Sequence, residues 1–241
     1  MTDLPDTKRV VRSSLGGQVA DIIREQILTG ELHVGDRVVQ AEWAARLQVS
    51  RMPVRDAIVS LCHEGLLHNT ASGAAVVAPV DVDVMADIFE VNALVAGQAA
   101  RRAATRVSEQ EIGELDRLQE QLAQAVAGGD MHAASEINWS LHRVVNRAAD
   151  SPRLSALLRT LSTGTPRTSF ELIPGWGEQA LEDHKQLIAA LRDGDGERAY
   201  EVAREHVARG TGPLLEQLEA RFAADKRAQG ASPAPHAAVG G

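Results

Sequence analysis

Hydrophobic residues recur at helical spacing in three stretches near the start of the chain. The first covers 15–29 and ends at Gly30, a residue type that commonly terminates helices. The second lies within 41–47, and the third runs from about 51 to 62. The apolar positions are Leu15, Val19, Ile22, Ile23, Ile27 and Leu28; Trp43, Ala44 and Leu47; and Val54, Ala57, Ile58, Leu61 and Cys62. Because only residues 48–50 separate the last two stretches, the pattern predicts two helices joined by a tight turn.

The third predicted helix begins with recognisable signals and leads into two short strands. Ser50 is a residue type that caps helices, and Pro53 is tolerated because it falls in the first turn. Residues 66–69 and 74–78 alternate well enough for strands, and the segment 70–73 joins them as a turn. We therefore expect a winged helix-turn-helix domain over 15–79.

From residue 83 onward the pattern is helical throughout. The predicted helices span 83–105, 108–127, 130–149, 152–163, 178–193, 195–209 and 213–226. Ser108 with Glu111 predicts a capping box at the second of them. The predicted fold class is mainly α: an N-terminal winged helix-turn-helix domain with a two-strand wing, then an all-α antiparallel helical bundle over 80–226. Residues 1–14 are predicted to be a flexible arm, and 227–241, rich in Ala, Gly and Pro, a disordered tail.

The net charge of −8 at first argues against a nucleic-acid-binding protein. The charge is unevenly distributed, however. Residues 1–80 carry 8 Lys and Arg against 9 Asp and Glu, whereas the remainder carries 17 against 24. The acid excess thus belongs to the second domain. DNA affinity would depend on individually placed arginines, and on two copies of the chain, more than on a broad basic field.

The sequence lacks the usual signs of export or membrane insertion. It contains no run of about 18 apolar residues. Its N-terminus lacks a charged segment followed by an apolar one. Cys62 is the single cysteine and cannot form an intrachain disulfide, so we expect it to be a small buried hydrophobe. These features predict a cytoplasmic protein with no membrane partner.

Two arginines mark the third predicted helix as a candidate recognition helix. Arg51 and Arg55 are four residues apart, so both project from the N-terminal half of one face. In helix-turn-helix proteins this region meets base edges and phosphates in the major groove. On an isolated helix, two such arginines would more simply form a solvated face. DNA binding is favoured here, because three further features stand at the expected spacing: the capping Ser50, Pro53 in the first turn, and the segment 64–66 that follows the helix.

The sequence VSRMPVRDA at 49–57, with EGLL at 64–67, resembles the VSRTPVREAL…EGLV signature of GntR-family winged helix-turn-helix repressors. The resemblance runs from about Leu15 to Pro79 and implies a dimeric regulator that binds a palindromic operator in double-stranded DNA. The DNA-contacting residues implied are Arg37, Ser50, Arg51, Met52, Arg55, Ser72 and Gly73. Ser72 departs from the Arg or His that family wings usually carry before the Gly, and Ala41 stands where some members place an Arg.

Three histidine-containing segments of the helical half resemble the FCD ligand-binding domain, the usual C-terminal partner in the FadR-like branch of the GntR family. They are INWSLH at 137–142, EDHKQLIAALRDGD at 182–195 and AYEVAREH at 199–206. The resemblance implies that Asn138, His142, His184 and His206 converge on a divalent metal ion, with zinc favoured over nickel or manganese. Three imidazoles and an amide oxygen suit such an ion and leave coordination positions open. A single histidine at helical spacing would instead be a core residue.

The same resemblance implies a small-molecule effector, with a carboxylate favoured. Family members often carry an Arg in the cavity and a Glu near it, whereas Asn92 and Ala96 occupy the matching positions here. Arg143, Arg147 or Arg167 could substitute for the missing guanidinium. Asn92 and Arg143 are therefore the candidate effector-binding residues.

These features together predict a ligand-responsive transcriptional repressor that a metabolite releases from DNA. One alternative keeps the DNA binding but makes the bundle a metal-free pocket or a dimer scaffold. Another is a metal-dependent helical hydrolase or isomerase, but no carboxylate is obviously placed as a general base, and the winged domain would then be idle. Trp139 and Trp176 either line the pocket or pack in the core, with packing favoured for Trp139.

Overall fold

The computed structural model describes residues 15–79, 81–162 and 173–230, with the backbone alone at 225–230. The chain divides into two compact units, Met1–Pro79 and Val80–Gly241. The predicted mainly α fold class is confirmed, because helices account for most of the described residues. None of the helices in these ranges combines the length and apolar character that a membrane span requires. The predicted arm at 1–14 and most of the predicted tail, at 231–241, lie outside the described residues.

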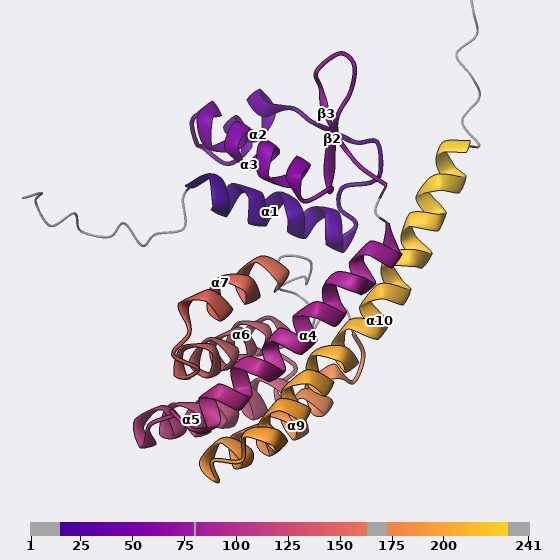
Figure 1. The fold of residues 1–241 in the computed structure, drawn as a ribbon. Helices are drawn as coiled ribbons and strands as arrows, with labels where there is room; N and C mark the ends of the chain where they lie inside the picture. The colour runs from indigo at the N-terminus through magenta and orange to yellow at the C-terminus, as the bar shows by residue number, and fades with distance from the viewer. Residues whose placement is uncertain (1–14, 80, 163–172, 231–241) are drawn as a thin grey trace, which may run out of the picture. The chain divides into compact units, whose positions relative to one another are not determined.

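The first unit combines three helices with a small antiparallel sheet (Figure 1). Its elements are α1 (Leu15–Thr29), β1 (Arg37–Val38), α2 (Gln40–Arg46), α3 (Arg51–His63), β2 (Leu67–Asn69) and β3 (Ala75–Val77). Helices α2 and α3 are the predicted pair, and β2 and β3 are the predicted wing strands. The sequence did not predict β1, which pairs with β3 and gives the strand order β1-β3-β2. A strand of two residues is too short to show an alternating pattern.

The core of the first unit follows the predicted apolar positions, with local exceptions. Ile23, Ile27 and Leu61 are fully buried. Cys62 is only half-buried, so its prediction as a buried hydrophobe was wrong. Ser50 occupies the N-cap of α3 in an extended conformation, but its side chain makes no capping hydrogen bond. The helix start is therefore favoured by backbone geometry rather than by the predicted side-chain cap.

The second unit is helical wherever the structure describes it. Its helices are α4 (Val82–Ala104), α5 (Glu109–Ala127), α6 (Met131–Ala148), α7 (Pro152–Leu161), α9 (Trp176–Arg192) and α10 (Gly196–Gly230). The capping box predicted between Ser108 and Glu111 is present at the start of α5. A continuous apolar core joins the helices, and it includes Ala99, Leu115, Leu141, Val144, Leu187, Leu191 and Val202.

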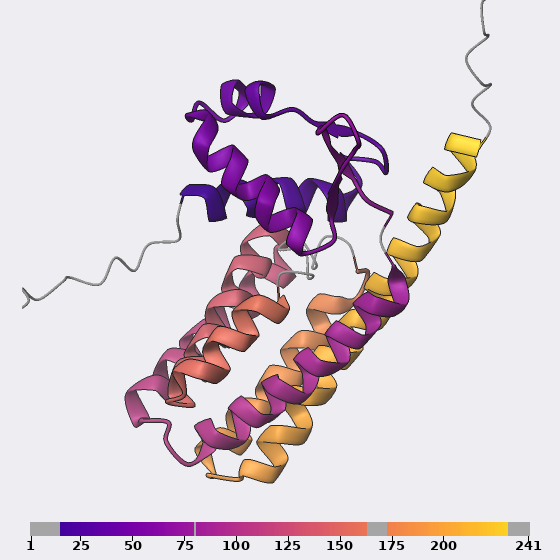
Figure 2. The same ribbon diagram turned by 45° about the horizontal axis from the view of Figure 1, so that its top comes forward.

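Helix α10 is a single element where the sequence predicted two, so the predicted break between 209 and 213 was wrong. Pro213 lies inside the helix, where it removes one backbone hydrogen bond. Beyond it, Leu214 and Leu218 are both buried and continue the apolar stripe. Helix α10 runs beside α4 in both views of the ribbon (Figures 1 and 2). Tertiary packing thus outweighs the local cost of the proline, and the helix continues past 226 to Gly230.

Candidate metal centre and nucleic-acid interface

Helix α3 presents the predicted DNA-contacting side chains to solvent. Arg51, Met52 and Arg55 are exposed, whereas Val54 and Ala57 are fully buried on the opposite face. The hydrogen bonds and ion pairs among the described residues leave the guanidinium groups of Arg51 and Arg55 free. Their charges are therefore available for an external anion.

A hollow of about 440 Å³ lies beside α3, and its lining includes residues of α2, α3, the three strands and the wing turn. Arg37 from β1, Arg55 from α3 and Gly73 from the wing turn all line it. Gly73 has φ +78°, a conformation that favours glycine. Ser72 is exposed beside it but does not line the hollow, and its hydroxyl lies 2.9 Å from Thr70 Oγ1. Three predicted DNA-contacting residues thus share one concave surface.

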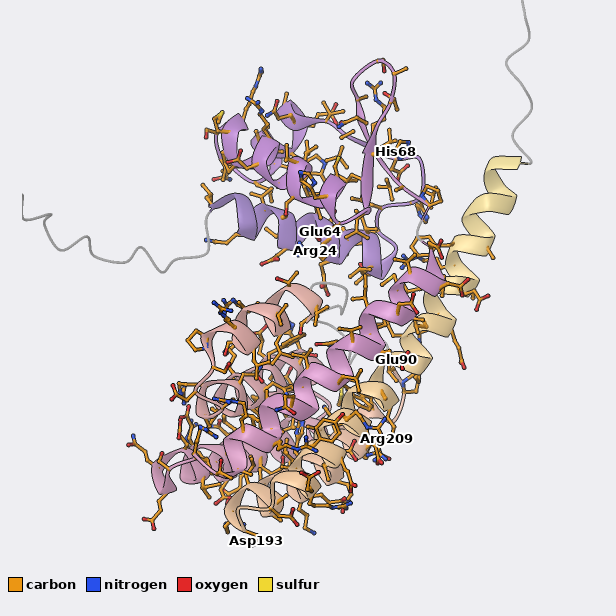
Figure 3. The ribbon with its side chains drawn as sticks, viewed as in Figure 1. Arg24, Glu64, His68, Glu90, Asp193 and Arg209 are labelled. Carbon is orange, nitrogen blue, oxygen red and sulfur yellow. The ribbon has the colours of Figure 1, made fainter. Side chains whose placement is uncertain are left out.

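A partly buried ion pair fixes α1 to the end of α3 (Figure 3). Arg24 donates from Nε to Glu64 Oε2 at 2.7 Å and from Nη2 to Oε1 at 2.9 Å. A third bond runs from its Nη1 to Asp21 Oδ1 at 2.6 Å. Burial of the guanidinium disfavours its charge, but Glu64 and Asp21 outweigh this effect and raise the pKa of Arg24. The pair therefore stays charged and anchors the C-terminal end of α3, where Glu64 is the C-cap residue, to α1.

Three histidines from three helices of the second unit form one cluster. His142 on α6, His184 on α9 and His206 on α10 each offer a ring nitrogen, and these atoms lie within 4.8 Å of one another. Nε2 of His206 is 3.3 Å from Nε2 of His142, and the ring centroids of His184 and His206 are 4.7 Å apart. His184 and His206 are buried, and His142 is partly exposed. The structure thus brings together the three predicted imidazole ligands.

Burial favours the neutral form of two of these imidazoles, those of His142 and His184. Desolvation, with a smaller effect of nearby His206, lowers the pKa of His142 to about 3. The same two causes, with His142 in addition, hold the pKa of His184 well below its ordinary value. Neither ring nitrogen of His184 has a hydrogen-bond partner among the described residues. Neutral imidazoles with unused lone pairs are what a metal ion binds.

The sequence reasoning missed Asp183, a buried carboxylate beside the cluster. Its Oδ2 accepts a hydrogen bond from Nδ1 of His206 at 3.2 Å, and its Oδ1 accepts one from Arg209 at 2.8 Å. Burial opposes the charge of Asp183, but the bonds from His206 and Gln179 lower its pKa. One signal was available, because Asp183 falls on the helical face of α9 that carries the buried Ala180 and Leu187. A charged residue on a buried face needs a partner.

The remaining predicted site residues differ in their placement. Asn138 is buried one turn before His142 on α6, and its Oδ1 has no hydrogen-bond partner among the described residues. Asn92 is buried on α4, and its Oδ1 is likewise unpartnered within those residues. Arg143 instead lies on the exposed face of α6 and donates to Ser140 Oγ at 2.8 Å. It is therefore not brought to the buried face that carries Asn138.

Arg147, another of the arginines considered above, does not supply a buried guanidinium either. Arg147 is exposed and pairs with Glu114 at 2.8 Å, and Arg167 lies outside the described residues. Trp176 is buried and stacks on His206 with ring centroids 5.1 Å apart. It therefore packs directly against the histidine cluster.

Both units match known protein families. The gntR family of bacterial regulatory proteins matches residues 15–77, and the FCD domain matches residues 87–209. An uncharacterised HTH-type transcriptional regulator of Mycobacterium tuberculosis is 30% identical over 192 residues, which cover 79% of this chain and 78% of that protein. The chain belongs to the GntR family. The FCD match is consistent with the FadR-like branch of this family.

Two further relatives support the GntR assignment. A probable D-xylose utilization operon transcriptional repressor of Paenarthrobacter nicotinovorans is 30% identical over 209 residues, covering 84% of this chain and 89% of the relative. The structure of Escherichia coli McbR is 25% identical with a TM-score of 0.70, covering 85% of this chain and 98% of McbR. These relatives are named as regulators, so this GntR-family chain is a DNA-binding transcriptional regulator and not an enzyme. The three clustered histidines all lie within its FCD region.

Proposed function

We propose that this GntR-family protein is a ligand-responsive repressor that binds palindromic operator DNA as a homodimer. A small metabolite, with a carboxylate favoured, binds beside a divalent metal ion in the helical domain and releases the protein from DNA. The observation that carries this proposal is a cluster of three histidines from three helices, whose ring nitrogens lie close together within the FCD region. The first unit of the same chain matches a DNA-binding family.

On the DNA side, each copy places the N-terminal half of α3 in a major groove. Arg51 and Arg55 contact base edges and phosphates there, and Met52 contacts a base beside them. Arg37, Ser50, Ser72 and Gly73 contact the backbone. Two copies read half-sites about one helical turn apart, roughly 34–36 Å. The exposure of these residues, and the hollow that Arg37 shares with Arg55, support this assignment.

On the metal side, His142, His184 and His206 supply ring nitrogens, and Asn138 supplies its amide oxygen. The donor set fits such an ion, because the ring nitrogens of His184 and the Oδ1 of Asn138 are buried and unpartnered among the described residues. A nitrogen-rich, uncharged set suits zinc or nickel better than manganese, and zinc is the ion that we propose. When bound, the ion would act as a Lewis acid that holds an anionic ligand at its open positions.

The helical domain offers an anionic effector few other positive charges. No Lys or Arg side chain is buried in the described part of this domain. The metal would therefore supply most of the charge that meets a carboxylate, while Arg143, exposed and bonded to Ser140, contributes less than the sequence predicted. Asn92 Oδ1 and Ser135 Oγ are buried and unpartnered among the described residues, so they are available for a hydroxyl or amide of the effector.

A metal-free effector pocket is the second candidate. It is favoured by the same uncharged, buried polar side chains, because Asn138 adds no negative charge to attract a cation and Asn92 replaces a cavity arginine. In that case the histidines would hydrogen-bond the effector directly.

The experiment selects an operator from random duplex DNA and follows its binding by fluorescence anisotropy. Zinc and a panel of small carboxylates are then added to the wild type and to the His142→Ala/His184→Ala variant. We expect at least one carboxylate to weaken binding by the wild type only, while the variant still binds DNA. His132→Ala, which alters an exposed histidine on α6, is the matched control. Release that is equal in all three proteins would contradict the metal-dependent mechanism.

A further inference from the structure

We infer that Asp183 is a positioning residue that sets the ring orientation and the tautomer of His206 for metal binding, and that Arg209 and Gln179 hold Asp183 in that role. This inference rests on the metal site proposed above. It concerns a carboxylate that stands behind the histidine cluster and does not belong to the group of potential ligand atoms.

The two oxygens of Asp183 have separate partners. Oδ2 accepts from Nδ1 of His206 at 3.2 Å. Oδ1 accepts from Nη2 of Arg209 at 2.8 Å and from Nε2 of Gln179 at 2.9 Å. The side chain of Asp183 is 2% exposed, whereas that of Arg209 is 44% exposed. The bonds therefore form a chain from the solvent-facing side of α10 (Figure 3, Arg209) through a buried carboxylate to the cluster.

This arrangement fixes the tautomer of His206. An ionised carboxylate can only accept hydrogen bonds, so Nδ1 of His206 must carry the proton that it shares with Asp183. A neutral imidazole protonated at Nδ1 has a bare lone pair at Nε2. That Nε2 atom faces His142 at 3.3 Å. Asp183 thus directs the ligating nitrogen of His206 into the cluster, which is the usual function of a carboxylate behind a metal-binding histidine.

The ring of His206 is also held from its face. Trp176 stacks on it with an interplanar angle of 29°. Gly210, one turn after His206 on α10, allows this stacking, because a Cβ at that position would lie 2.7 Å from the indole. Asp183 fixes the Nδ1 edge of the imidazole and Trp176 fixes one face. The opposite edge, with Nε2, therefore faces the cluster in one orientation.

Replacing Asp183 by Asn tests the tautomer and not simply the packing. The amide has the same shape but only one oxygen, and the donors on Arg209 and Gln179 both compete for it. The NH2 group then faces Nδ1 of His206, which must become an acceptor. The proton moves to Nε2, where it points into the cluster and weakens metal binding at that nitrogen.

The first measurement is the two-bond ¹H–¹⁵N NMR spectrum of ¹⁵N-histidine-labelled, metal-free protein, with His206→Gln used to assign the His206 signals. We expect a proton on Nδ1 in the wild type and on Nε2 in Asp183→Asn. Glu205→Gln is the matched control, because Glu205 lies 3.5 Å from Arg209 on the exposed side and removal of its charge leaves Asp183 intact. This control should keep the proton on Nδ1.

The second measurement is zinc affinity by competition with a chromophoric chelator. Asp183→Asn should bind zinc about 10–100-fold more weakly than the wild type, the usual effect of losing such a partner. Glu205→Gln should match the wild type. Equal zinc affinity of Asp183→Asn and the wild type would overturn the inference and leave the metal site standing, as would a proton on Nε2 in the wild type. A wild type that binds no zinc would overturn the proposed site together with the inference. If Asp183→Asn does not fold, the tautomer of His206 in the wild type still tests the inference.

Discussion

The Nε2 atoms of His142 and His206 lie 3.3 Å apart, although 64 positions separate the two residues in the sequence. Two nitrogens bound to one tetrahedral zinc at about 2.0–2.1 Å each lie roughly 3.3–3.4 Å from one another. His184 brings a third ring nitrogen into the same group, with all three atoms within 4.8 Å. The packing of α6, α9 and α10 thus gives the nitrogens of His142 and His206 the separation that a shared cation requires, and brings a ring nitrogen of His184 close to both.

Zinc should stabilise the protein against heat. A ligand at 100 times its dissociation constant stabilises the folded state by about 2.7 kcal/mol. We expect zinc to raise the melting temperature of the wild type and of His132→Ala, and a chelator to lower it again. His142→Ala and His184→Ala should lose this response. An equal rise in all four proteins, measured by calorimetry, would argue against these ligands.

The metal-free protein should lose stability in mild acid because of His142 and His184. Burial lowers the pKa of His142 to about 3 and holds the pKa of His184 well below its ordinary value. In the unfolded chain both pKa values return to about 6.5, so below that pH the unfolded state binds more protons. The stability that these histidines confer is therefore fully present above about pH 6.5 and declines as the pH falls toward 3.

Urea unfolding of the metal-free protein at a series of pH values checks this prediction. Each histidine contributes at most about 1.4 kcal/mol per pH unit to the slope. The His142→Gln/His184→Gln variant should therefore show a shallower dependence between pH 6.5 and 4.5. Identical slopes for the two proteins would show that these pKa values are not depressed.

Each of the substitutions Arg51→Ala and Arg55→Ala should weaken operator binding by about 1–3 kcal/mol, the range for a specific base contact. The reason is that both guanidinium groups are exposed on α3 and unpaired among the described residues. Arg159→Ala, which removes an exposed arginine from α7, should bind DNA normally. Anisotropy titrations at fixed salt give the comparison. Wild-type affinity in both α3 variants would exclude α3 as the helix that contacts the operator bases.

Glu64→Ala should destabilise the first unit more than Asp21→Ala. Glu64 binds both Nε and Nη2 of Arg24, whose side chain is 8% exposed, so its loss leaves a buried guanidinium with one carboxylate. We expect a cost of about 2 kcal/mol. Asp21 is 50% exposed, and its loss should cost less than about 1 kcal/mol. Chemical denaturation of both variants measures the difference, and the opposite order would contradict this role for Glu64.

The DNA-binding unit could be predicted from the sequence because its signals are local. Pro53 in the first turn of α3 and the apolar stripe through Val54 and Leu61 are read from neighbouring residues. The ion pair of Arg24 with Glu64 joins residues 40 positions apart, and no local pattern indicates it. The strand β1 was missed because its stability comes from pairing with β3 rather than from its own two residues.

The helical unit illustrates the same limit. The three histidines were predicted through resemblance to a family, whereas Asp183 was missed because two of its three partners, His206 and Arg209, lie on another helix. Pro213 predicts a helix end from local propensity alone. In the folded chain, the buried Leu214 and Leu218 stabilise the continuation of α10.

The most direct test of the proposed metal centre is the metal content of the protein purified without chelator. Inductively coupled plasma mass spectrometry would be applied to the wild type and to the His142→Ala/His184→Ala variant. We predict about one divalent metal ion per chain in the wild type, as for a single closed set of ligands, and none in the variant. No metal in the wild type, even after soaking with zinc, nickel and manganese, would contradict the metal centre. The DNA-binding assignment would then stand, and the helical domain would have to bind its effector without a metal.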